Sequence, residues 1–227
     1  MRAAMGRGIL VIGLLIPLVP LVLWSVTRTW QYPSLLPQEY DLRGFEELGR
    51  PGSDLLEGVT TSSIIAIVVT LAAAGIGLSA GRALGLYHFR SKRLIQFLML
   101  APVIVPAFAV TMGIQVLFIR VGLNDTLWGV ALVHMIPTVP YVTLVMGGVF
   151  ANYDVAYEEQ ARVLGAGPLS ILFRVTLPAV FPGLAVASLF AFVISWSEYL
   201  LTLLVGGGTV KTMPLLLFAY IGGNDST

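Results

Sequence analysis

The chain has 227 residues, of which 57% are hydrophobic and 11% are charged, and its formal net charge is +1. Charged residues make up about a quarter of an ordinary soluble domain, so most of this surface is not suited to water. The low charge excludes a strongly basic nucleic-acid-binding face, and the lack of cysteine excludes disulfides, thiolate metal sites and a cysteine nucleophile. The length suits one domain, which we expect to cover residues 1–227.

The first predicted element is an apolar run over residues 8–26, preceded by Arg2 and Arg7. A secretory signal peptide begins in a similar way, but no small-residue cleavage pattern follows this run. A helix needs about 20 apolar residues to cross the roughly 30 Å of bilayer hydrocarbon. We therefore interpret residues 8–26 as a retained membrane span.

A polar segment over residues 29–57 follows, and it is the only sizeable stretch predicted to lie in water. Its prolines, glycines and charges suit a partly ordered external loop with a short amphipathic helix near residues 42–48. One interpretation is a contact for an external protein, and the other is a solvated connector. The sequence leaves both open.

Four further apolar segments are long enough to cross a membrane: residues 60–84, 94–119, 127–150 and 177–204. Backbone polar groups find no water partners in lipid, so each segment is predicted to be a helix. The predicted fold class is all-α, a polytopic membrane helix bundle with five spans in this chain.

Small residues and prolines mark special positions inside these spans. In the second span, close packing against another helix is predicted for a group of small residues, Gly75, Gly77, Ser79 and Gly81. In the third and fourth spans, kinks are predicted at four prolines, Pro102, Pro106, Pro137 and Pro140.

The lysines and arginines favour one orientation. With the N-terminus in the cytoplasm, eight of the 13 lie on the cytoplasmic side, among them the cluster Arg90-Ser91-Lys92-Arg93. We therefore expect a multi-pass protein with its N-terminus in the cytoplasm. In this orientation the polar segment over residues 152–176 also lies in the cytoplasm.

The segment over residues 152–176 begins with signals for a helix. Asn152 and Asp154 are suitable N-caps, and Glu158 and Glu159 suit the positive end of the dipole of the helix that follows. A charged helix is unusual in such an apolar sequence, so we expect it to serve a function outside the membrane.

A turn and a second helix are predicted next. Gly165 and Gly167 interrupt the first helix, and Pro168 suits the first turn of a second one. Glu159 and Arg162 lie three residues apart on one helix face, so they could pair with each other or with charges on a partner. The segment is therefore predicted to form a compact helix–turn–helix knob.

The pattern E-x-A-x3-G-x9-V-x-L-P runs from Glu159 to Pro178 and resembles the "EAA" signature of permease subunits of bacterial binding-protein-dependent ABC importers. The matched positions are Glu159, Ala161, Gly165, Val175, Leu177 and Pro178. Gln160 replaces the usual first alanine and Val175 the usual isoleucine, and neither change disturbs helix compatibility. The resemblance extends over most of the chain, because the order of the spans also fits.

This resemblance implies a type I importer (MetI-like) fold in the bacterial inner membrane, with six helices per subunit around a central pathway. Residues 152–176, hereafter the coupling segment, would dock on a partner ATPase. The implied docking residues are Glu159, Ala161, Arg162, Leu164, Gly165, Leu169, Leu177 and Pro178. The sixth span is absent before residue 227, so we expect a truncation, with residues 205–227 forming an external segment that contains a short helix opened by Pro214.

The resemblance also implies the partners: ABC ATPase subunits, a second permease subunit, an external solute-binding protein and the lipid bilayer, but no nucleic acid. The sequence has no G-x4-G-K-[ST] phosphate-binding loop, so ATP and its Mg²⁺ would sit on another polypeptide. We therefore expect a transport subunit that is not an enzyme and holds no cofactor or metal.

Within this family, residues 30–37 and 197–202 look most like the spermidine/putrescine-type branch. That branch also includes relatives that handle iron, thiamine and phosphonates. The expected solute is a polyamine or another small charged solute. Spermidine-type systems pair two different permeases, so the second permease is expected to be a paralogue.

Polar side chains at membrane depth are candidates for a substrate pathway or gate, because they are costly to place there. Glu198 could attract a cationic solute, or it could belong to an interfacial Trp/Tyr belt. His134 could line the pathway, or it could be a hydrogen-bonded packing residue. The full candidate set is Glu198, Ser195, Trp196, Tyr199, Gln115 and His134.

Two other classes of protein remain as alternatives. An ATP-independent secondary transporter or channel would act without a partner ATPase, but it leaves the pattern from Glu159 to Pro178 unexplained. A membrane enzyme would need a catalytic constellation inside the membrane, and the sequence shows none.

Overall fold

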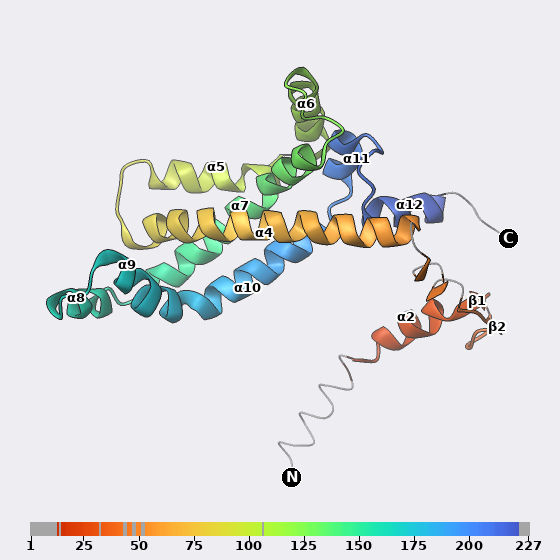
Figure 1. Cartoon of the computed structure of the whole chain (residues 1–227), viewed down its shortest axis with the longest axis horizontal. Helices are drawn as coiled ribbons and strands as arrows, with labels where there is room; N and C mark the ends of the chain where they lie inside the picture. The colour runs from red at the N-terminus through yellow and green to blue at the C-terminus, as the bar shows by residue number, and fades with distance from the viewer. Residues whose placement is uncertain are drawn as a thin grey trace, which may run out of the picture. The chain divides into compact units, whose positions relative to one another are not determined.

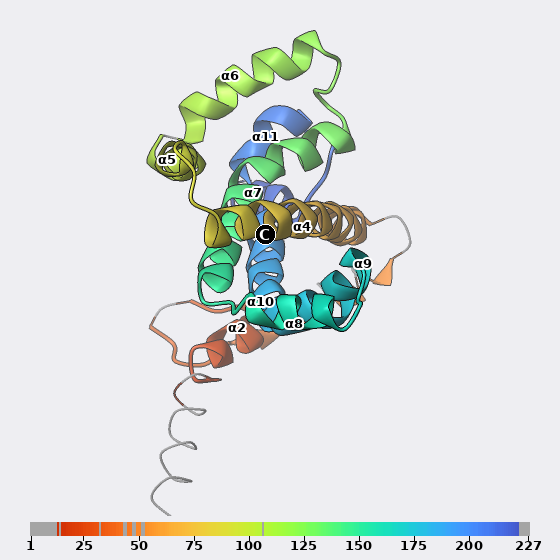
Figure 2. The ribbon, with the colours of Figure 1, turned by 90° about the vertical axis from the view of Figure 1, so that its left-hand side faces the viewer.

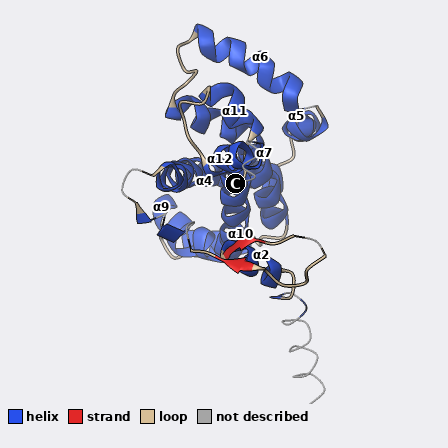
Figure 3. Cartoon of the chain, turned by 90° about the vertical axis from the view of Figure 1, so that its right-hand side faces the viewer, coloured by secondary structure: helices blue, strands red, loops and turns tan. Residues whose placement is uncertain are grey.

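The structure is a computed structural model that describes residues 13, 15–31, 33–42, 45–46, 49–50, 53–105 and 107–222. Contacts along the chain divide it into two units, Met1–Leu56 and Glu57–Thr227, and each is described by itself. Helices form nearly all of the regular structure in the described residues (Figure 3). The predicted all-α class is therefore confirmed.

The first unit contains a short helix followed by a strand pair. Helix α2 (Leu18–Ser25) lies in the first predicted span, whose residues 8–12 and 14 are outside the described part. Strands β1 (Thr27–Thr29) and β2 (Glu39–Tyr40) pair in antiparallel fashion, which the sequence analysis did not predict. The amphipathic helix predicted near residues 42–48 falls largely on residues outside the described ones.

Three helices of the described chain are long and apolar enough to cross a membrane (Figure 1). They are α4 (Asp54–Leu86), α7 (Leu127–Ala151) and the continuous helical stretch Pro168–Trp196. These helices correspond to the second, fourth and fifth predicted spans. The Ser53 hydroxyl caps the start of α4 by accepting a hydrogen bond of 3.2 Å from the Leu56 N–H.

The prediction of a single span over residues 94–119 was wrong, because two helices take the place of one continuous helix. They are α5 (Lys92–Ile104) and α6 (Ala107–Arg120). Val105 between them is extended, with φ −81° and ψ 136°, as expected for a residue that precedes a proline in the sequence. Each helix is only about 20 Å long, too short to cross the bilayer by itself.

The fifth predicted span was also too long at its C-terminal end. Helix α10 (Leu177–Trp196) stops before a break over residues 197–199, and α11 (Leu200–Gly206) follows. The side chain of Glu198 caps α11 by accepting a hydrogen bond of 3.2 Å from the Leu201 N–H. The short helix predicted in the C-terminal tail is present as α12 (Met213–Gly222).

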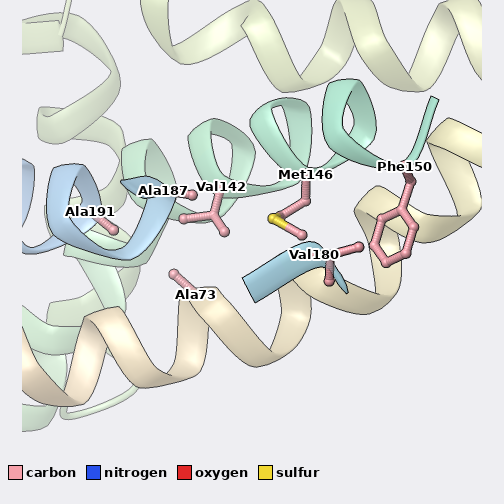
Figure 4. Packing of buried hydrophobic residues seen from close by; sticks show 7 residues of the cluster. All are labelled: Ala73, Val142, Met146, Phe150, Val180, Ala187 and Ala191. Atoms are coloured by element: carbon pink, nitrogen blue, oxygen red, sulfur yellow. The ribbon is translucent and has the colours of Figure 1, made fainter. Parts of the chain in front are cut away.

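The core of the second unit lies where α4, α7 and α10 meet (Figure 4). Glycines on α4 allow α7 to approach closely: a Cβ on Gly77 would lie 2.5 Å from Val142, and one on Gly81 would lie 2.9 Å from the Gly147 nitrogen. Gly75 and Ser79, predicted to share this face, are exposed instead. The buried cluster consists of Ala73, Val142, Met146, Phe150, Val180, Ala187 and Ala191.

Candidate functional site

The coupling segment forms two short helices at one end of the long helices (Figures 1 and 2). Helix α8 (Ala156–Val163) is followed by α9 (Pro168–Ile171), and α9 continues through a π-helix, η1 (Leu172–Thr176), into α10. The predicted helix–turn–helix is therefore confirmed.

Each of the two helices begins at a residue with a local signal for a helix start. Asp154 Oδ1 accepts a hydrogen bond of 2.9 Å from the Ala156 N–H at the start of α8. Asn152, predicted as an alternative N-cap, instead ends α7, where its amide donates to the Gly148 carbonyl at 2.9 Å. Pro168 occupies the first turn of α9, as predicted.

The turn between the two helices depends on Gly165. This residue has φ +84°, a conformation that favours glycine. Its N–H bonds the Arg162 carbonyl at 2.9 Å, and the Ala166 N–H bonds the Ala161 carbonyl at 3.0 Å. These two bonds form a Schellman motif, which satisfies carbonyls at the end of α8. A Cβ on Gly165 would meet nothing within 4 Å, so the backbone conformation alone demands glycine.

A buried ion pair attaches α8 to α4. The Glu158 side chain is 1% exposed, and its two carboxylate oxygens accept hydrogen bonds of 2.8 and 2.7 Å from the two terminal nitrogens of Arg82. The Thr176 hydroxyl donates a third bond of 2.7 Å to the same carboxylate. The Arg82 hydrogen bonds hold the pKa of the Glu158 carboxyl below its usual value.

Two further groups surround this ion pair. The Arg82 guanidinium lies 5.9 Å from the centre of the Phe150 ring on α7, within range of a cation–π contact. Arg162 approaches Glu158 at 3.8 Å along α8. Arg162 therefore pairs with Glu158. The partner considered in the sequence analysis was the next residue, Glu159.

The π-helix η1 joins the coupling segment to the membrane helix without a break. Its widened turn is closed by the Leu177 N–H, which bonds the carbonyl of Leu172 five residues earlier. Pro178 comes next and has no N–H to donate, and its ring would collide with the carbonyl four residues back in an ordinary α-turn. The wider turn relieves that conflict, so the helix continues over Pro168–Trp196.

Apolar side chains on the coupling segment are exposed to an unusual degree. Val163 is 88% exposed, Leu164 87% and Leu169 71%. Of the predicted docking residues, Ala161 and Leu177 are half-buried. The others are exposed, namely Glu159, Arg162, Leu164, Gly165, Leu169 and Pro178.

Two of the predicted pathway residues, His134 and Ser195, meet in a buried hydrogen-bonded cluster. His134 Nδ1 lies 3.0 Å from the Ser195 hydroxyl, and Nε2 lies 2.8 Å from the Thr202 hydroxyl. Thr202 itself donates to the Glu198 carbonyl at 3.0 Å, so its oxygen accepts a hydrogen bond from the Nε2–H of His134, and the Ser195 hydroxyl donates to Nδ1. The cluster fits a neutral histidine and ties α7, α10 and α11 together, which favours the packing interpretation of His134.

The remaining pathway candidates are spread over other contacts. Half-buried Glu198 lines a cavity of about 200 Å³ together with Thr111 on α6 and other residues of α5, α6, α7 and α11. Trp196 stacks on Phe192, and Tyr199 packs on Phe218 of α12, with ring centres 5.6 and 4.2 Å apart. Gln115 is half-buried on α6. These aromatic contacts agree with a packing role for Trp196 and Tyr199.

The sequence analysis missed the residues that attach the coupling segment. Arg82 entered it only as one of the eight lysines and arginines counted on the cytoplasmic side, and Glu158 only as a favourable charge near a helix start. A signal was present, because an arginine inside an apolar helix must find a partner. The identity of that partner depends on the fold, since Arg82 and Glu158 are 76 residues apart in sequence.

Comparisons with known proteins agree with this architecture. The spermidine/putrescine transport system permease protein PotC of Haemophilus influenzae is 26% identical over 167 residues, or 74% of this chain and 65% of that protein. The putrescine transport system permease protein PotI of Escherichia coli K12 is 28% identical over 192 residues, or 80% of this chain and 67% of that protein. The chain thus spans about two thirds of the length of these relatives.

The fold is shared with a solved structure and with a family model. A chain from the crystal structure of a bacterial ABC transporter involved in the import of the acidic polysaccharide alginate matches with a TM-score of 0.62 and 20% identity, over 100% of this chain and 80% of that one. The model of the family described as binding-protein-dependent transport system inner membrane component matches residues 73–222. Because that match covers more than half of the chain, this protein belongs to the family of inner membrane components of binding-protein-dependent transport systems.

Proposed function

We propose that this chain is the membrane-spanning permease subunit of an ATP-driven ABC importer. It forms part of the solute pathway, and its coupling segment docks on a separate ATPase subunit that binds ATP and Mg²⁺. The complex also contains a second permease, expected to be a paralogue, and an external solute-binding protein. In this arrangement the N-terminus and the coupling segment lie on the cytoplasmic side of the inner membrane.

The observation that carries this proposal is the exposed apolar tip of the coupling segment. Val163, Leu164 and Leu169 are more than two-thirds exposed, and exposed Glu159 and Arg162 lie beside them. Charged neighbours make lipid an unsuitable environment for this tip, and water is a poor one for its leucines and valine. A protein surface with an apolar groove and a charged rim suits both kinds of side chain.

The geometry of the segment also suits coupling. Its second helix continues into α10 as a single stretch of 29 residues, and its first helix is attached to α4 by a buried ion pair. A displacement of the tip is therefore passed to the membrane helices instead of being absorbed by a flexible loop. Movement of the ATPase would shift the helix bundle between two states of the pathway.

The solute we propose is a polyamine or another small cation. PotC and PotI are named as spermidine/putrescine and putrescine permeases, and they align over most of this chain. Glu198 places one carboxylate at a cavity of about 200 Å³ next to the break between α10 and α11. That carboxylate would attract a cationic amine as it passes.

Docking is tested by association of the chain with its neighbouring-gene ATPase in detergent. Val163→Ser removes an apolar side chain from the tip, and Val121→Ser makes the same change at an exposed valine after α6. We expect Val163→Ser to weaken ATPase binding about tenfold, in line with the loss of one well-packed interface side chain. Val121→Ser should bind the ATPase as the unmodified chain does. Equal binding by both variants would contradict the docking site.

Transport is tested by ATPase activity of the full complex with the binding protein and a panel of solutes. A polyamine should raise the rate, and Glu198→Gln should reduce that rise. Stimulation only by anionic or neutral solutes would rule out the polyamine proposal while leaving the importer intact. Solute uptake by this chain alone, without an ATPase, would instead support the secondary transporter.

A further inference from the structure

The coupling segment is attached to the three core helices in two different ways. The backbone joins it directly to α7 at one end and, through η1, to α10 at the other. Helix α4 has no such backbone connection and is reached by side chains. Arg82 on α4 donates two hydrogen bonds, of 2.8 and 2.7 Å, to Glu158 on α8.

The carboxylate of Glu158 lies at a junction of four elements. It accepts from Arg82 on α4 and from Thr176 at the end of η1, and it belongs to α8 itself. The Arg82 guanidinium also faces Phe150 on α7. Two parallel N–H···O bonds fix the orientation of a carboxylate as well as its distance, so this junction permits one relative placement of α8 and α4.

The ion pair is a poor choice if its role is to hold the fold together. Removing the Glu158 carboxylate and much of the Arg82 side chain from water costs much of what their attraction returns. Apolar replacements of buried pairs are often as stable or more stable. An apolar contact, however, would allow α8 to slide along α4. A buried bidentate pair is explained better by the placement that it specifies than by the stability that it adds.

We propose that Arg82 and Glu158 form a positioning pair that makes α4 move with α8 when the ATPase moves the coupling segment. This inference rests on the proposed function, because it concerns how movement at the docking site reaches the membrane helices. In the absence of the pair, the tip would still dock, and α10 and α7 would still follow through the backbone. Helix α4 would follow only through its packing against α7, so opening of the pathway would be poorly coupled to ATP.

The first test measures ATPase activity of the complex with and without solute-loaded binding protein, together with ATPase association. Glu158→Gln should leave association unchanged, because the tip is intact. It should lower the ratio of stimulated to basal activity about tenfold, within the usual range of coupling between sites. Arg82→Lys should give an intermediate ratio, since lysine keeps the charge but cannot form the second parallel bond. Asn152→Ala is the control, because it removes a hydrogen bond between the C-cap of α7 and the last turn of that helix.

The second test measures the placement itself and does not depend on activity. The chain has no cysteine, so spin labels can be attached at Ser79→Cys on α4 and Gln160→Cys on α8, which are both exposed positions. The distance between these labels should be narrowly distributed and the same with and without ATP. With Glu158→Gln added, the distribution should broaden or shift.

Two results would overturn the inference. One is a Glu158→Gln complex that keeps its full stimulation ratio. The other is a distance between α4 and α8 that changes on ATP binding while the pair is intact. Failure of the unmodified chain to bind any ATPase would be a different result, because it would refute the proposed function. The label distances without ATP would then still report whether the pair fixes α8 on α4.

Discussion

Replacing Gly81 by alanine tests the close packing of α4 against α7. The new Cβ would overlap with Met146 and would lie 2.9 Å from the backbone nitrogen of Gly147. Backbone atoms cannot rotate away as the end of a flexible side chain can, so the two helices must separate. Such overpacking costs about 1–3 kcal/mol, and the better helix propensity of alanine returns at most about 1 kcal/mol.

Gly75→Ala provides a matched control on the same helix. A Cβ there meets nothing within 4 Å, so only the gain in helix propensity remains. The free energies of unfolding of the two variants should therefore differ by about 1–3 kcal/mol, with Gly81→Ala the less stable. Equilibrium unfolding by detergent titration, followed by circular dichroism, measures this difference. If Gly81→Ala were as stable as Gly75→Ala, α4 and α7 would not be packed as the structure shows.

Four further predictions concern single residues. Glu158→Ala should destabilise the protein by less than the ~3–5 kcal/mol lost when a fully buried pair is broken, because Arg82 loses its partner but its side chain is 27% exposed to water. Thermal unfolding would measure this. Arg82 lowers the pKa of Glu158, so the contribution of the pair should be complete above the ordinary pKa of 4.5 and should disappear as the pH falls through the lowered value. A Glu158→Gln variant should not lose stability in this way at low pH. If the stability of the variant and of the unmodified chain changed identically with pH, the pair would add nothing to stability. Gly165→Ala should cost about 1–2 kcal/mol in the left-handed conformation and weaken ATPase association. Gly167→Ala, at a position with φ −73°, should neither destabilise the protein nor weaken ATPase association. Equal ATPase binding by the Gly165→Ala and Gly167→Ala variants would contradict the role of the turn. His134→Ala should cost about 1–3 kcal/mol, because the buried Ser195 hydroxyl loses its partner while Thr202 still donates to the Glu198 carbonyl. An unchanged unfolding temperature would show that the cluster does not support the fold.

Local sequence was sufficient for the helices of the coupling segment. Glycine at a left-handed position, proline in a first helical turn and acids near a helix start act through their own backbone or the next few residues. Gly165, Pro168 and Asp154 accordingly lie where their chemistry predicted. The pattern from Glu159 to Pro178 also led to the family, because its spacing is carried by one short stretch of chain.

Hydropathy alone was a weaker guide to where the membrane helices end. The apolar run over residues 94–119 reads as one span, yet extended backbone at Val105 divides it into α5 and α6. The run over residues 177–204 likewise continues past Trp196, where Glu198 caps a new helix. Average hydrophobicity does not register a single extended residue or a capping side chain, so both runs were read as single spans, although a kink was predicted at Pro106 in the first of them.

The amino-acid sequence by itself determined the class of the protein, the position of the helix–turn–helix over residues 152–176 and the turn at Gly165, because composition and short-range backbone preferences are sufficient for each of these. Only the tertiary structure decided which residues attach that segment to the rest of the molecule. Arg82 and Glu158 are separated by 76 positions, and nothing in the sequence around either residue indicates that the other is its partner. Their meeting depends on how closely α4 and α7 pack, which the glycines of α4 allow and the fold as a whole sets.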